Sequence, residues 1–420
     1  MKSTRTPSPD QTLSVAMLVT NDMLNDPRVA RHAETLADQG FKVTVICPLT
    51  QRTTTRETRD GYEILRVRSP TCNYLSELSH RIKSRVGNGA EQSGAPTRIG
   101  RTFLLRMILA IVRICALQLK LLRAAQTTNA HVYCSNDFDT LLIGVLSARF
   151  DRKLVYDSHE LWTDMLIGVP PFFKSVLRQV EKRLIKRANV VATVNEFIAR
   201  ELRSRYSLHR PVQVVYNYPN LPATKTQMRT PHTMKKVLYQ GRYSPERGLE
   251  NLVRSSEFLL PDVELAFRGY GEIEKELRAL ASGRPAVRFE EPVKMEHLVE
   301  AAQDADVGVV SYMPTNLCNY LASPNKLFEY IHAGLAIAAS DMPFLRKVVL
   351  EDHIGLLFDP RDSRDIARVL NLVTRPDALE QFKKNIASAA KKYSWETQSP
   401  KLVRLYRELA EQFSAPRPPA

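Results

Sequence analysis

The chain has 420 residues, more than one ordinary hydrophobic core accommodates, so we expect two domains. Its 44% hydrophobic and 25% charged residues are typical of a globular protein and exclude wholesale disorder. The formal net charge is +15 and it is uneven: residues 1–210 hold 32 Lys and Arg against 19 Asp and Glu, whereas residues 211–420 hold 28 against 26. A negatively charged partner is therefore expected to meet the N-terminal half.

The cysteines, at positions 47, 72, 115, 134 and 318, form no C-x-x-C pair and have no histidine at zinc-ligand spacing. This pattern argues against a disulfide framework and structural zinc, and it favours a reducing, cytoplasmic compartment. The first apolar stretch runs into Asn21-Asp22 without a small-residue cleavage site. We therefore expect residues 1–12 to be a flexible N-terminus and residues 14–20 to be the first strand.

A β–α–β unit opens the first domain. The strand at 14–20 is followed by a helix at 27–39 and a strand at 42–47, which predicts a parallel sheet. Asp26 is placed to cap this helix, and Gly40 is placed to end it.

The same alternation continues to residue 216. Further strands are expected near 131–135, 153–157, 190–194 and 212–216, with a helix at 172–187. Residues 13–216 therefore form a predicted Rossmann-like domain. The Ser-, Gly- and Arg-rich stretch at 70–100 is long for a connection and is expected to be a mobile insertion.

A second α/β domain is predicted for residues 236–394, after a proline-containing linker at 217–235. Its expected elements are strands at 237–241, 263–268, 287–290, 307–311 and 336–340, a helix capped at Ser244, and a helix at 326–333. Two doubly wound sheets that face one cleft are the predicted architecture, with residues 395–420 as a final helix and flexible tail.

Two glycine-containing turns follow strands of the second domain. The first runs from Gly241 to Gly248 and places Arg242 and Arg247 beside the free amides of a helix start, where a diphosphate would be held. The second contains Gly269, which would let a ligand approach the backbone. Both patterns are also found in turns without a ligand, so neither is sufficient alone.

A third candidate site is the helix that ends at Gly334. Lys326 and Glu329 lie on its first turns, so its start can meet phosphate oxygens while Glu329 accepts hydrogen bonds from two hydroxyls. The alternative is that Glu329 is a solvated acid in the first turns, favoured by the helix dipole.

In the first domain, His159 and Glu160 follow the strand near 153–157. Ligands of open α/β sheets bind at this carboxyl edge, so both residues are candidates for catalysis. A lone histidine is more often a packed or solvated residue, but this one stands beside two carboxylates.

Together these motifs resemble glycosyltransferase family four. The resemblance covers nearly the whole chain, and its most specific blocks are Gly241-Arg242 with Arg247-Gly248, and Asn325-Lys-Leu-Phe-Glu-Tyr330. It also includes Asp26-Pro-Arg-Val29, Asn136-Asp-Phe-Asp-Thr-Leu141, Tyr156-Asp-Ser-His-Glu160 and Tyr393-Ser-Trp-Glu396.

The resemblance implies a GT-B fold, with an N-terminal acceptor domain, a C-terminal nucleotide-sugar domain and a last helix that crosses back to the first domain. It further implies that Gly241, Gly269 and Asn325 belong to the donor site, where Arg242 and Arg247 hold the donor diphosphate. Lys326 would add phosphate contacts, Glu329 would bind the ribose, and His159 would touch the transferred sugar.

Two positions depart from the family pattern. The paired acids spaced E-x7-E keep only the second member, Glu329, because the first position is Leu321. The loop after the first strand, residues 20–25, has no glycine, whereas many relatives have a Gly-Gly turn there. Asn21 or Asp22 is expected to fill that role differently.

The resemblance also implies transfer with retention of configuration and without a catalytic metal or other cofactor. No carboxylate is an evident covalent nucleophile, so we favour front-face attack, in which the leaving phosphate oxygen accepts the acceptor proton. Glu160 is an alternative base. The expected partners are a nucleotide sugar and a saccharide or lipid-linked acceptor, in polysaccharide or glycoconjugate biosynthesis.

Two alternatives stay open. A nucleotide-sugar 2-epimerase shares the two-domain architecture and would convert the donor without an acceptor. A basic membrane-surface or nucleic-acid-binding protein would explain the sequence pI of 9.6, although basic–aromatic nucleic-acid motifs are missing and no nucleic acid is expected.

The segment 81–123 predicts a peripheral position at an anionic membrane. It holds nine basic residues and one acid, Glu91. The uncharged run between Arg106 and Arg113 is six residues, against roughly 20 required to span a bilayer. The alternative is an ordinary helix of the first domain with its arginines in solvent.

Overall fold

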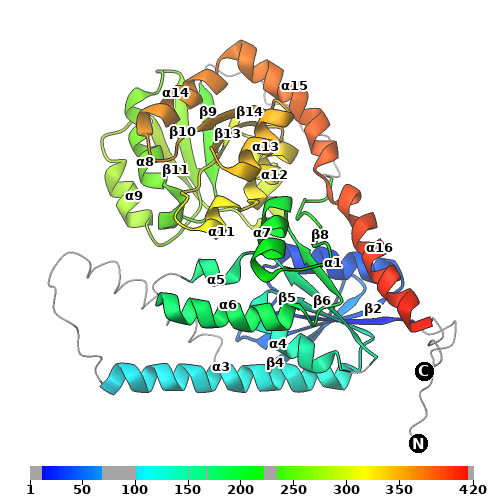
Figure 1. Ribbon diagram of the computed structural model, residues 1–420. Coiled ribbons are helices and arrows are strands. Elements are labelled where there is room, and N and C mark those ends of the chain that lie inside the picture. The colour runs from blue at the N-terminus through cyan, green and yellow to red at the C-terminus, as the bar shows by residue number, and fades with distance from the viewer. Residues whose placement is uncertain (1–11, 69–100, 150, 167–168, 222–233, 415–420) are drawn as a thin grey trace, which may run out of the picture. The chain divides into compact units, whose positions relative to one another are not determined.

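The computed structural model describes residues 12–68, 101–149, 151–166, 169–221 and 234–414. The expected mobile insertion at 70–100, nearly all of the segment 1–12, most of the linker 217–235 and the end of the tail lie outside the described residues. The chain divides into two compact units (Figure 1). Unit 1 comprises Met1–Thr193, Leu202–Val214 and Lys401–Ala420, and unit 2 comprises Val194–Glu201 and Val215–Pro400.

Unit 1 contains an eight-stranded sheet in the order β3-β4-β2-β1-β5-β6-β7-β8. Its strands are β1 Ser14–Leu18, β2 Lys42–Leu49, β3 Arg56–Arg59, β4 Tyr62–Arg68, β5 Val132–Asn136, β6 Lys153–Ser158, β7 Val190–Thr193 and β8 Gln213–Val214. All neighbours pair in parallel except β3 and β4, an antiparallel pair at the edge. The parallel sheet expected from the β–α–β pattern is confirmed, and the edge hairpin is an addition to it.

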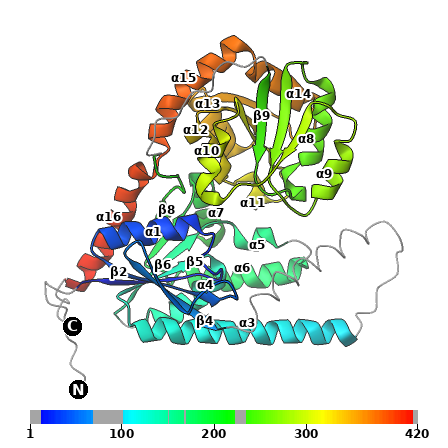
Figure 2. The same ribbon diagram turned by 180° about the vertical axis from the view of Figure 1, so that it is seen from behind.

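The helices of unit 1 cover both faces of this sheet. They are α1 Pro27–Asp38, α3 Arg101–Thr128, α4 Phe138–Ser147, α5 Trp162–Met165, α6 Pro171–Ile185 and α7 Glu196–Tyr206, whose first turns cluster with unit 2. Right-handed crossovers place α1 on one face and α3, α4 and α6 on the other, and Figures 1 and 2 show α1 and α3 on opposite sides of the sheet. The Asp26 side chain accepts a hydrogen bond from the Val29 amide, which confirms the predicted cap of α1.

The last described helix, α16 Trp395–Ser414, belongs to both units. Its residues from Lys401 onwards cluster with unit 1, where Tyr406 packs edge-on against Phe41 and the Arg407 guanidinium donates to the Gln39 side chain at 2.7 Å. The expected return of the chain end to the first domain is therefore present.

Unit 2 contains a six-stranded parallel sheet in the order β11-β10-β9-β12-β13-β14. Its strands are β9 Lys235–Gln240, β10 Val263–Arg268, β11 Val287–Glu290, β12 Val307–Val310, β13 Ala336–Ser340 and β14 Gly355–Phe358. Its helices include α8 Leu249–Ser255, α9 Glu274–Leu280, α10 Leu298–Ala302, α11 Leu317–Tyr320, α12 Asn325–Ala333, α13 Pro343–Glu351, α14 Ser363–Val373 and α15 Pro376–Lys392. The central strands are fully buried, as expected for a sheet covered on both faces.

The helix expected to be capped at Ser244 begins later than predicted. Ser244 precedes a short 3-10 turn, Pro245–Arg247, and its side chain makes no capping hydrogen bond. Gly248 then takes a left-handed conformation, with φ of 62°, and α8 starts at Leu249. The left-handed residue separates the turn from the helix, because a continuous right-handed helix cannot pass through it.

Candidate functional site

Two cations of unit 2 rest on aromatic rings between the ends of β9 and β12. The Arg247 guanidinium carbon lies 3.7 Å from the centre of the Tyr312 ring, and Lys326 Nζ lies 3.9 Å from the centre of the Tyr239 ring. Lys326 Nζ is also 5.9 Å from the Tyr312 ring centre, so one ring is shared. Such contacts hold a cation in place without neutralising it.

The environment of these cations favours an anion. Burial and the nearby positive charge of Arg247 hold the pKa of Lys326 well below its ordinary value, with Glu329 opposing this effect. Arg247 Nη1 is buried and makes no hydrogen bond to the protein. Because a buried guanidinium N–H without an acceptor is costly, an anionic ligand would stabilise this arrangement.

The glycines after β9 and β10 let the backbone of these turns come close to Lys326 and to each other. Gly241 has φ of 141°, and a Cβ atom there would lie 3.1 Å from Lys326 Nζ. A Cβ atom on Gly269 would lie 1.9 Å from the Gly241 carbonyl oxygen. The structure thus gives Gly269 a packing role beneath Gly241, whereas the sequence suggested an approach by a ligand.

Arg242 is turned away from this pair of cations. Its guanidinium donates to Glu272 Oε1 at 2.9 Å, and its side chain is 63% exposed. The structure therefore places Arg247 and Lys326 together but gives Arg242 a surface ion pair. The expected clamp of two arginines requires Arg242 to leave Glu272 when the ligand binds.

Helix α12 supplies the other candidate residues. It begins at Asn325, ends before Gly334 in a left-handed cap, and carries Lys326 and Glu329 in its first turns. The Asn325 side-chain oxygen accepts a hydrogen bond from Asn217 at 2.9 Å, so Asn325 also ties the helix start to the chain near the linker. The first amides of this helix add to the positive end of the site.

Leu321 occupies a position where a carboxylate would be buried. It follows α11 and is 9% exposed, and its carbonyl accepts a hydrogen bond from the buried Asn195 side chain at 2.9 Å. This position is apolar and held by its backbone, so a contact from it to a sugar hydroxyl through a side-chain carboxylate is ruled out.

His159 in unit 1 lies between two carboxylates. Its Nδ1 is 3.3 Å from Asp137 Oδ2 and its Nε2 is 3.4 Å from Asp157 Oδ2. The His159 amide also donates to Asp137 Oδ1 at 2.8 Å. Although burial lowers its pKa, the two carboxylates raise it to about 9. Burial raises the pKa of Asp137 to about 7, so the imidazolium form of His159 is favoured most where Asp137 is ionised.

Asp157 is anchored from helix α1. Arg28 donates from Nε and Nη2 to the two oxygens of Asp157 at 2.9 and 2.7 Å, and His32 Nδ1 lies 3.6 Å from Asp157 Oδ2. Arg28, His32 and Asp157 are all at most 3% exposed. Burial opposes ionisation, but Arg28 and His159 outweigh it and hold the pKa of Asp157 well below its ordinary value.

Asp137 adopts a backbone conformation that residues other than glycine rarely take. Its φ is 65° and its ψ is 169°, and its amide donates to the Asp157 carbonyl at 2.9 Å. This conformation costs of order 1–3 kcal/mol for a residue other than glycine. The strain brings the Asp137 carboxylate onto both the amide and the ring of His159. Glu160, the residue after His159, has an exposed side chain.

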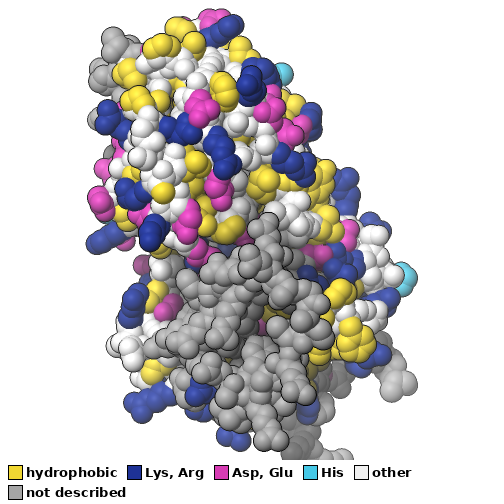
Figure 3. Space-filling model, turned by 90° about the vertical axis from the view of Figure 1, so that its left-hand side faces the viewer, with side chains coloured by type: hydrophobic (Ala, Val, Ile, Leu, Met, Phe, Trp, Pro, Cys, Tyr) yellow, Lys and Arg dark blue, Asp and Glu magenta, His cyan; other side chains and the backbone are white. Residues whose placement is uncertain are grey.

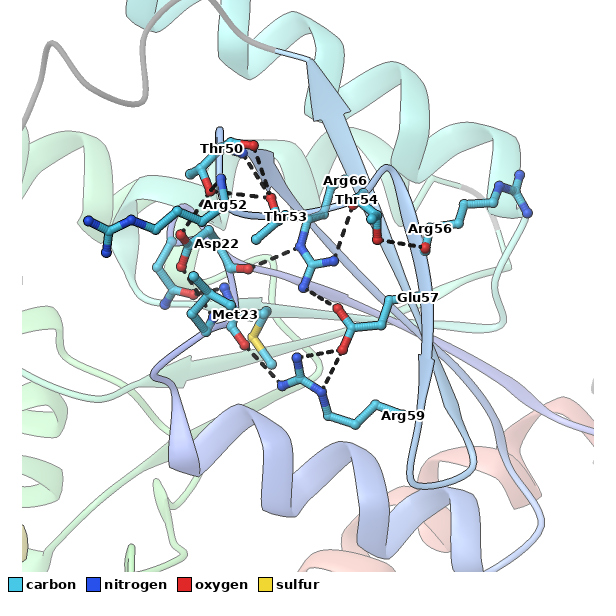
Figure 4. A network of polar contacts seen from close by, with 12 residues as sticks. Asp22, Met23, Thr50, Arg52, Thr53, Thr54, Arg56, Glu57, Arg59 and Arg66 are labelled. Carbon is cyan, nitrogen blue, oxygen red and sulfur yellow. Dashed lines mark hydrogen bonds and ion pairs between the residues drawn. The ribbon is translucent and has the colours of Figure 1, made fainter. Parts of the chain in front are cut away.

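The glycine-free loop after β1 is held by arginines of the β3–β4 hairpin (Figure 4). Arg66 Nε donates to the Asp22 carbonyl at 3.1 Å, and Arg59 Nη1 donates to the Met23 carbonyl at 3.0 Å. Glu57 pairs with both arginines, at 2.8 and 2.6 Å.

Met23 is buried in the left-handed conformation, with φ of 61°, where glycine would be unstrained. Asn21 and Asp22 use their side chains inside this loop. The Asn21 side-chain oxygen accepts from the Met23 amide at 2.9 Å, and an Asp22 oxygen accepts from Thr50 at 3.2 Å.

Sequence patterns did not predict four members of the His159 cluster, Arg28, His32, Asp137 and Asp157. They also did not predict the rings under the two cations, Tyr239 and Tyr312. The register of β5 and β6 pairs Asn136 with Asp157 and so brings Asp137 to the same edge, but this register is not evident from the sequence. Within the described part of the chain, no group of three or more His, Cys, Asp or Glu side chains is placed to hold a metal ion.

Comparison with protein families gives two matches. The model of Glycosyltransferase Family 4 matches residues 28–218, and the model of Glycosyl transferases group 1 matches residues 234–374. Each match falls within one half of the chain, and together they cover both candidate clusters.

Curated relatives match part of the chain. A phosphatidyl-myo-inositol mannosyltransferase of Mycobacterium leprae is 27% identical over 255 residues, which are 58% of this chain and 64% of that protein. The sulfoquinovosyl transferase SQD2 of Arabidopsis thaliana is 27% identical over 183 residues, which are 43% of this chain and 33% of that protein. The matches thus span less than two thirds of both relatives.

Solved structures resemble nearly the whole chain. Sucrose-phosphate synthase from Thermosynechococcus elongatus has a TM-score of 0.66 at 20% identity, with 95% of this chain and 99% of that chain covered. HepE of Anabaena, solved in complex with UDP-glucose, has a TM-score of 0.64 at 14% identity, with 94% and 100% covered. At these identities the likeness shows the fold, the GT-B fold of glycosyltransferases. With both family models matched and this fold present, the chain belongs to glycosyltransferase family four.

Proposed function

We propose that this protein transfers a sugar from a nucleoside-diphosphate sugar to a saccharide or lipid-linked acceptor, with retention of configuration. The observation that carries the proposal is the pair Arg247 and Lys326, two cations seated on aromatic rings, one of them with a buried N–H that has no acceptor. A diphosphate supplies the missing negative charge and acceptors.

The donor has one set of contacts for each of its parts. Arg247, Lys326 and the first amides of α12 take the diphosphate, and Gly241 leaves room for it next to Lys326 Nζ. Glu329 accepts hydrogen bonds from the ribose hydroxyls, and Arg242 joins after leaving Glu272. These cations stabilise the negative charge that develops on the leaving diphosphate.

His159 contributes a positive hydrogen-bond donor for the transferred sugar. Asp137 and Asp157 hold the ring and keep it protonated, so it donates a hydrogen bond and does not act as a base. The acceptor hydroxyl oxygen forms the new bond to the anomeric carbon while the bond from that carbon to the phosphate oxygen breaks. The acceptor proton passes to the leaving phosphate oxygen, and the nucleoside diphosphate departs.

The names of the relatives suggest the kind of acceptor. One is a mannosyltransferase named for phosphatidyl-myo-inositol, and another transfers a sulfoquinovosyl group. A lipid-linked acceptor agrees with the basic first half of this chain, since anionic lipid surfaces attract such segments. We include a peripheral membrane position in the proposal. Most of the predicted contact segment, 81–123, lies outside the residues whose side chains are described.

The test is turnover with UDP-, GDP- and dTDP-sugars, each alone and with a panel of saccharide and lipid-linked acceptors. A new glycoside of unchanged anomeric configuration, formed only when acceptor is present, is expected. Conversion of the donor without acceptor would instead identify a 2-epimerase. Turnover is expected to persist in EDTA, because Arg247 and Lys326 take the place of a divalent cation. Loss in EDTA that manganese restores would overturn that part of the proposal.

A further inference from the structure

Helices α3, α4 and α6 form one layer of unit 1, on the face of the sheet opposite α1, and α4 packs between the other two. Parallel-sheet proteins usually cover such a layer with polar side chains toward water. Here the outer side of the layer carries large apolar side chains.

The exposed apolar side chains are concentrated on α6. Phe172 is 72% exposed and Phe173 58%, and Val176 and Val180 are 43% and 37% exposed. We call these four residues the α6 ridge. Leu142 on α4 and Leu119 on α3, 50% and 56% exposed, are further exposed apolar side chains on helices of the same layer. Single exposed apolar residues are ordinary, but a contiguous set marks an interaction surface.

The outward side of α6 has an apolar part and a basic part. Phe172, Val176 and Val180 are four residues apart and therefore lie along one side of the helix. Arg183 continues this side at the C-terminal end of the helix, and Arg187 follows just beyond it. Glu181 and Ile185, by contrast, are buried against the domain. The outward side is thus apolar at its beginning and basic at its end.

The exposed charges on the described part of this layer are positive. In the described parts of α3, α4 and α6 the two acids face inward: Asp139 accepts from Thr20, and Glu181 accepts from Tyr156 and Tyr206. The exposed charges of these helices and of the turn after α6 are basic, namely Lys120, Arg123, Arg183, Lys186 and Arg187. In unit 2, by contrast, dark blue and magenta side chains are interspersed, as the upper part of Figure 3 shows.

We propose that the α6 ridge, with the basic residues that flank it, binds the surface of an anionic membrane. Helix α6 then lies in the headgroup region with Phe172 and Phe173 inserted and Arg183 and Arg187 at the lipid phosphates. The proposal rests on the proposed function only in that the membrane would present the acceptor.

The length and charge of α6 agree with binding at a membrane surface and not with crossing the membrane. Helix α6 has 15 residues, whereas roughly 20 are needed to cross a bilayer, and in the described part of the chain no helix is long and apolar enough to do so. An amphipathic helix at an interface gains from its inserted apolar area, and each nearby Lys or Arg adds about 1 kcal/mol on an anionic surface. Neither contribution suffices alone, so binding should need both the ridge and the anionic lipid.

The test is co-sedimentation of the full chain with vesicles of phosphatidylcholine alone or of phosphatidylcholine and phosphatidylglycerol in a 7:3 ratio. We expect the protein to pellet only with the anionic vesicles and to be released by high salt. The double variant Phe172→Asp and Phe173→Asp should lower the partition coefficient at least roughly tenfold. Reversal of both arginines, Arg183→Glu and Arg187→Glu, should lower it about fivefold or more for each residue.

The matched control is Leu260→Asp with Leu350→Asp, which places the same two negative charges at exposed apolar positions of unit 2. This variant should pellet like the wild type. Equal pelleting with neutral and anionic vesicles, or equal loss in the control, overturns the proposal. A change of oligomeric state in the Phe172 and Phe173 variant would also overturn it, because the ridge would then be an interface between copies.

Failure of this inference is separable from failure of the proposed function. UDP-glucose binding and transfer to a water-soluble acceptor are measured on the same preparations. Intact donor chemistry without vesicle binding rejects the ridge and the peripheral membrane position but leaves the sugar transfer standing. Vesicle binding that depends on Phe172 and Phe173, without any sugar transfer, rejects the sugar transfer and leaves the ridge standing.

Discussion

The two clusters differ in what balances their charge. In unit 1, His159 is held between Asp137 and Asp157, and Asp157 in turn is held by Arg28. In unit 2, Arg247 and Lys326 rest on the rings of Tyr312 and Tyr239, and a buried N–H of Arg247 has no acceptor. The charges of the first cluster are paired within the protein, although the buried Nε2 of His159 makes no hydrogen bond there, whereas the second cluster gains its charge balance from an anion.

Because of this difference, the two clusters should respond differently to substitution. A partnered buried charge contributes to the folded state, and removing its partner leaves an uncompensated charge. A cation without a counter-charge costs stability and is compensated when a ligand binds. Changes in unit 1 should therefore appear first in folding, and changes in unit 2 should appear first in donor binding.

The largest effect is expected for Arg28→Met, which strands the buried carboxylate of Asp157. The free energy of unfolding should fall by about 3–5 kcal/mol, measured by denaturant titration. Arg123→Met, on the exposed surface of α3, is the control and should change it by less than about 0.5 kcal/mol. Equal stabilities of the two variants would contradict the role given to Arg28.

Next in size is Arg247→Ala, which removes the cation on the Tyr312 ring and its buried Nη1. Donor or transition-state binding should weaken by about 1.5–3 kcal/mol, as when charged hydrogen bonds are lost, measured as kcat/KM for the nucleotide sugar. Thermal stability without ligand should not fall, because a costly unpaired group is lost. Undiminished turnover would refute the diphosphate contact.

A smaller effect is expected for Arg242→Ala. This side chain is mostly exposed and pairs with Glu272, and such surface pairs contribute at most about 1 kcal/mol. If kcat/KM falls as far as it does for Arg247→Ala, Arg242 does leave Glu272 and both arginines clamp the donor. Kinetics of the two single variants and the double variant distinguish these outcomes.

The smallest expected effect is on the pH dependence of the free energy of unfolding. The pKa of His159 is raised from 6.5 to about 9, so the stability that its charge provides is fully present below pH 6.5 and is lost as pH rises through about 9. Asp137→Asn removes one of the two carboxylates that raise this pKa, so the loss should move to lower pH. Unfolding measured between pH 6 and 10 tests this, and identical profiles would contradict it.

The fold was predictable where apolar runs are bounded by turns. The bounds of β10, β11 and β13 agree with the prediction residue for residue. Strands β10 and β13 are mostly or fully buried, whereas β11, Val-Arg-Phe-Glu, is an edge strand with no fully buried residue. The hairpin β3–β4 was not predicted, because β3 reads Arg-Glu-Thr-Arg and is stabilised by Glu57, Arg59 and Arg66 rather than by apolar burial. The start of α8 was misplaced because the left-handed Gly248 interrupts the turn.

The candidate site was predictable only in part. Lys326, Arg247 and His159 were identified because each follows a strand or begins a helix in a recognisable motif. Tyr239 and Tyr312 are 73 positions apart, and only the pairing of β9 with β12 brings them to one place. The role of Asp137 depends on an unusual φ and on a neighbouring strand, and no local pattern encodes either.

The central claim is that the donor nucleotide belongs to the cations of unit 2, and calorimetric titration of a nucleoside diphosphate tests it most directly. Wild type, Arg247→Ala, Glu329→Gln and His159→Ala are compared under one condition. We expect weaker binding in both unit 2 variants and unchanged nucleotide affinity in His159→Ala, which should lose turnover instead. Wild-type affinity in Arg247→Ala and Glu329→Gln, together with a loss in His159→Ala, would contradict it.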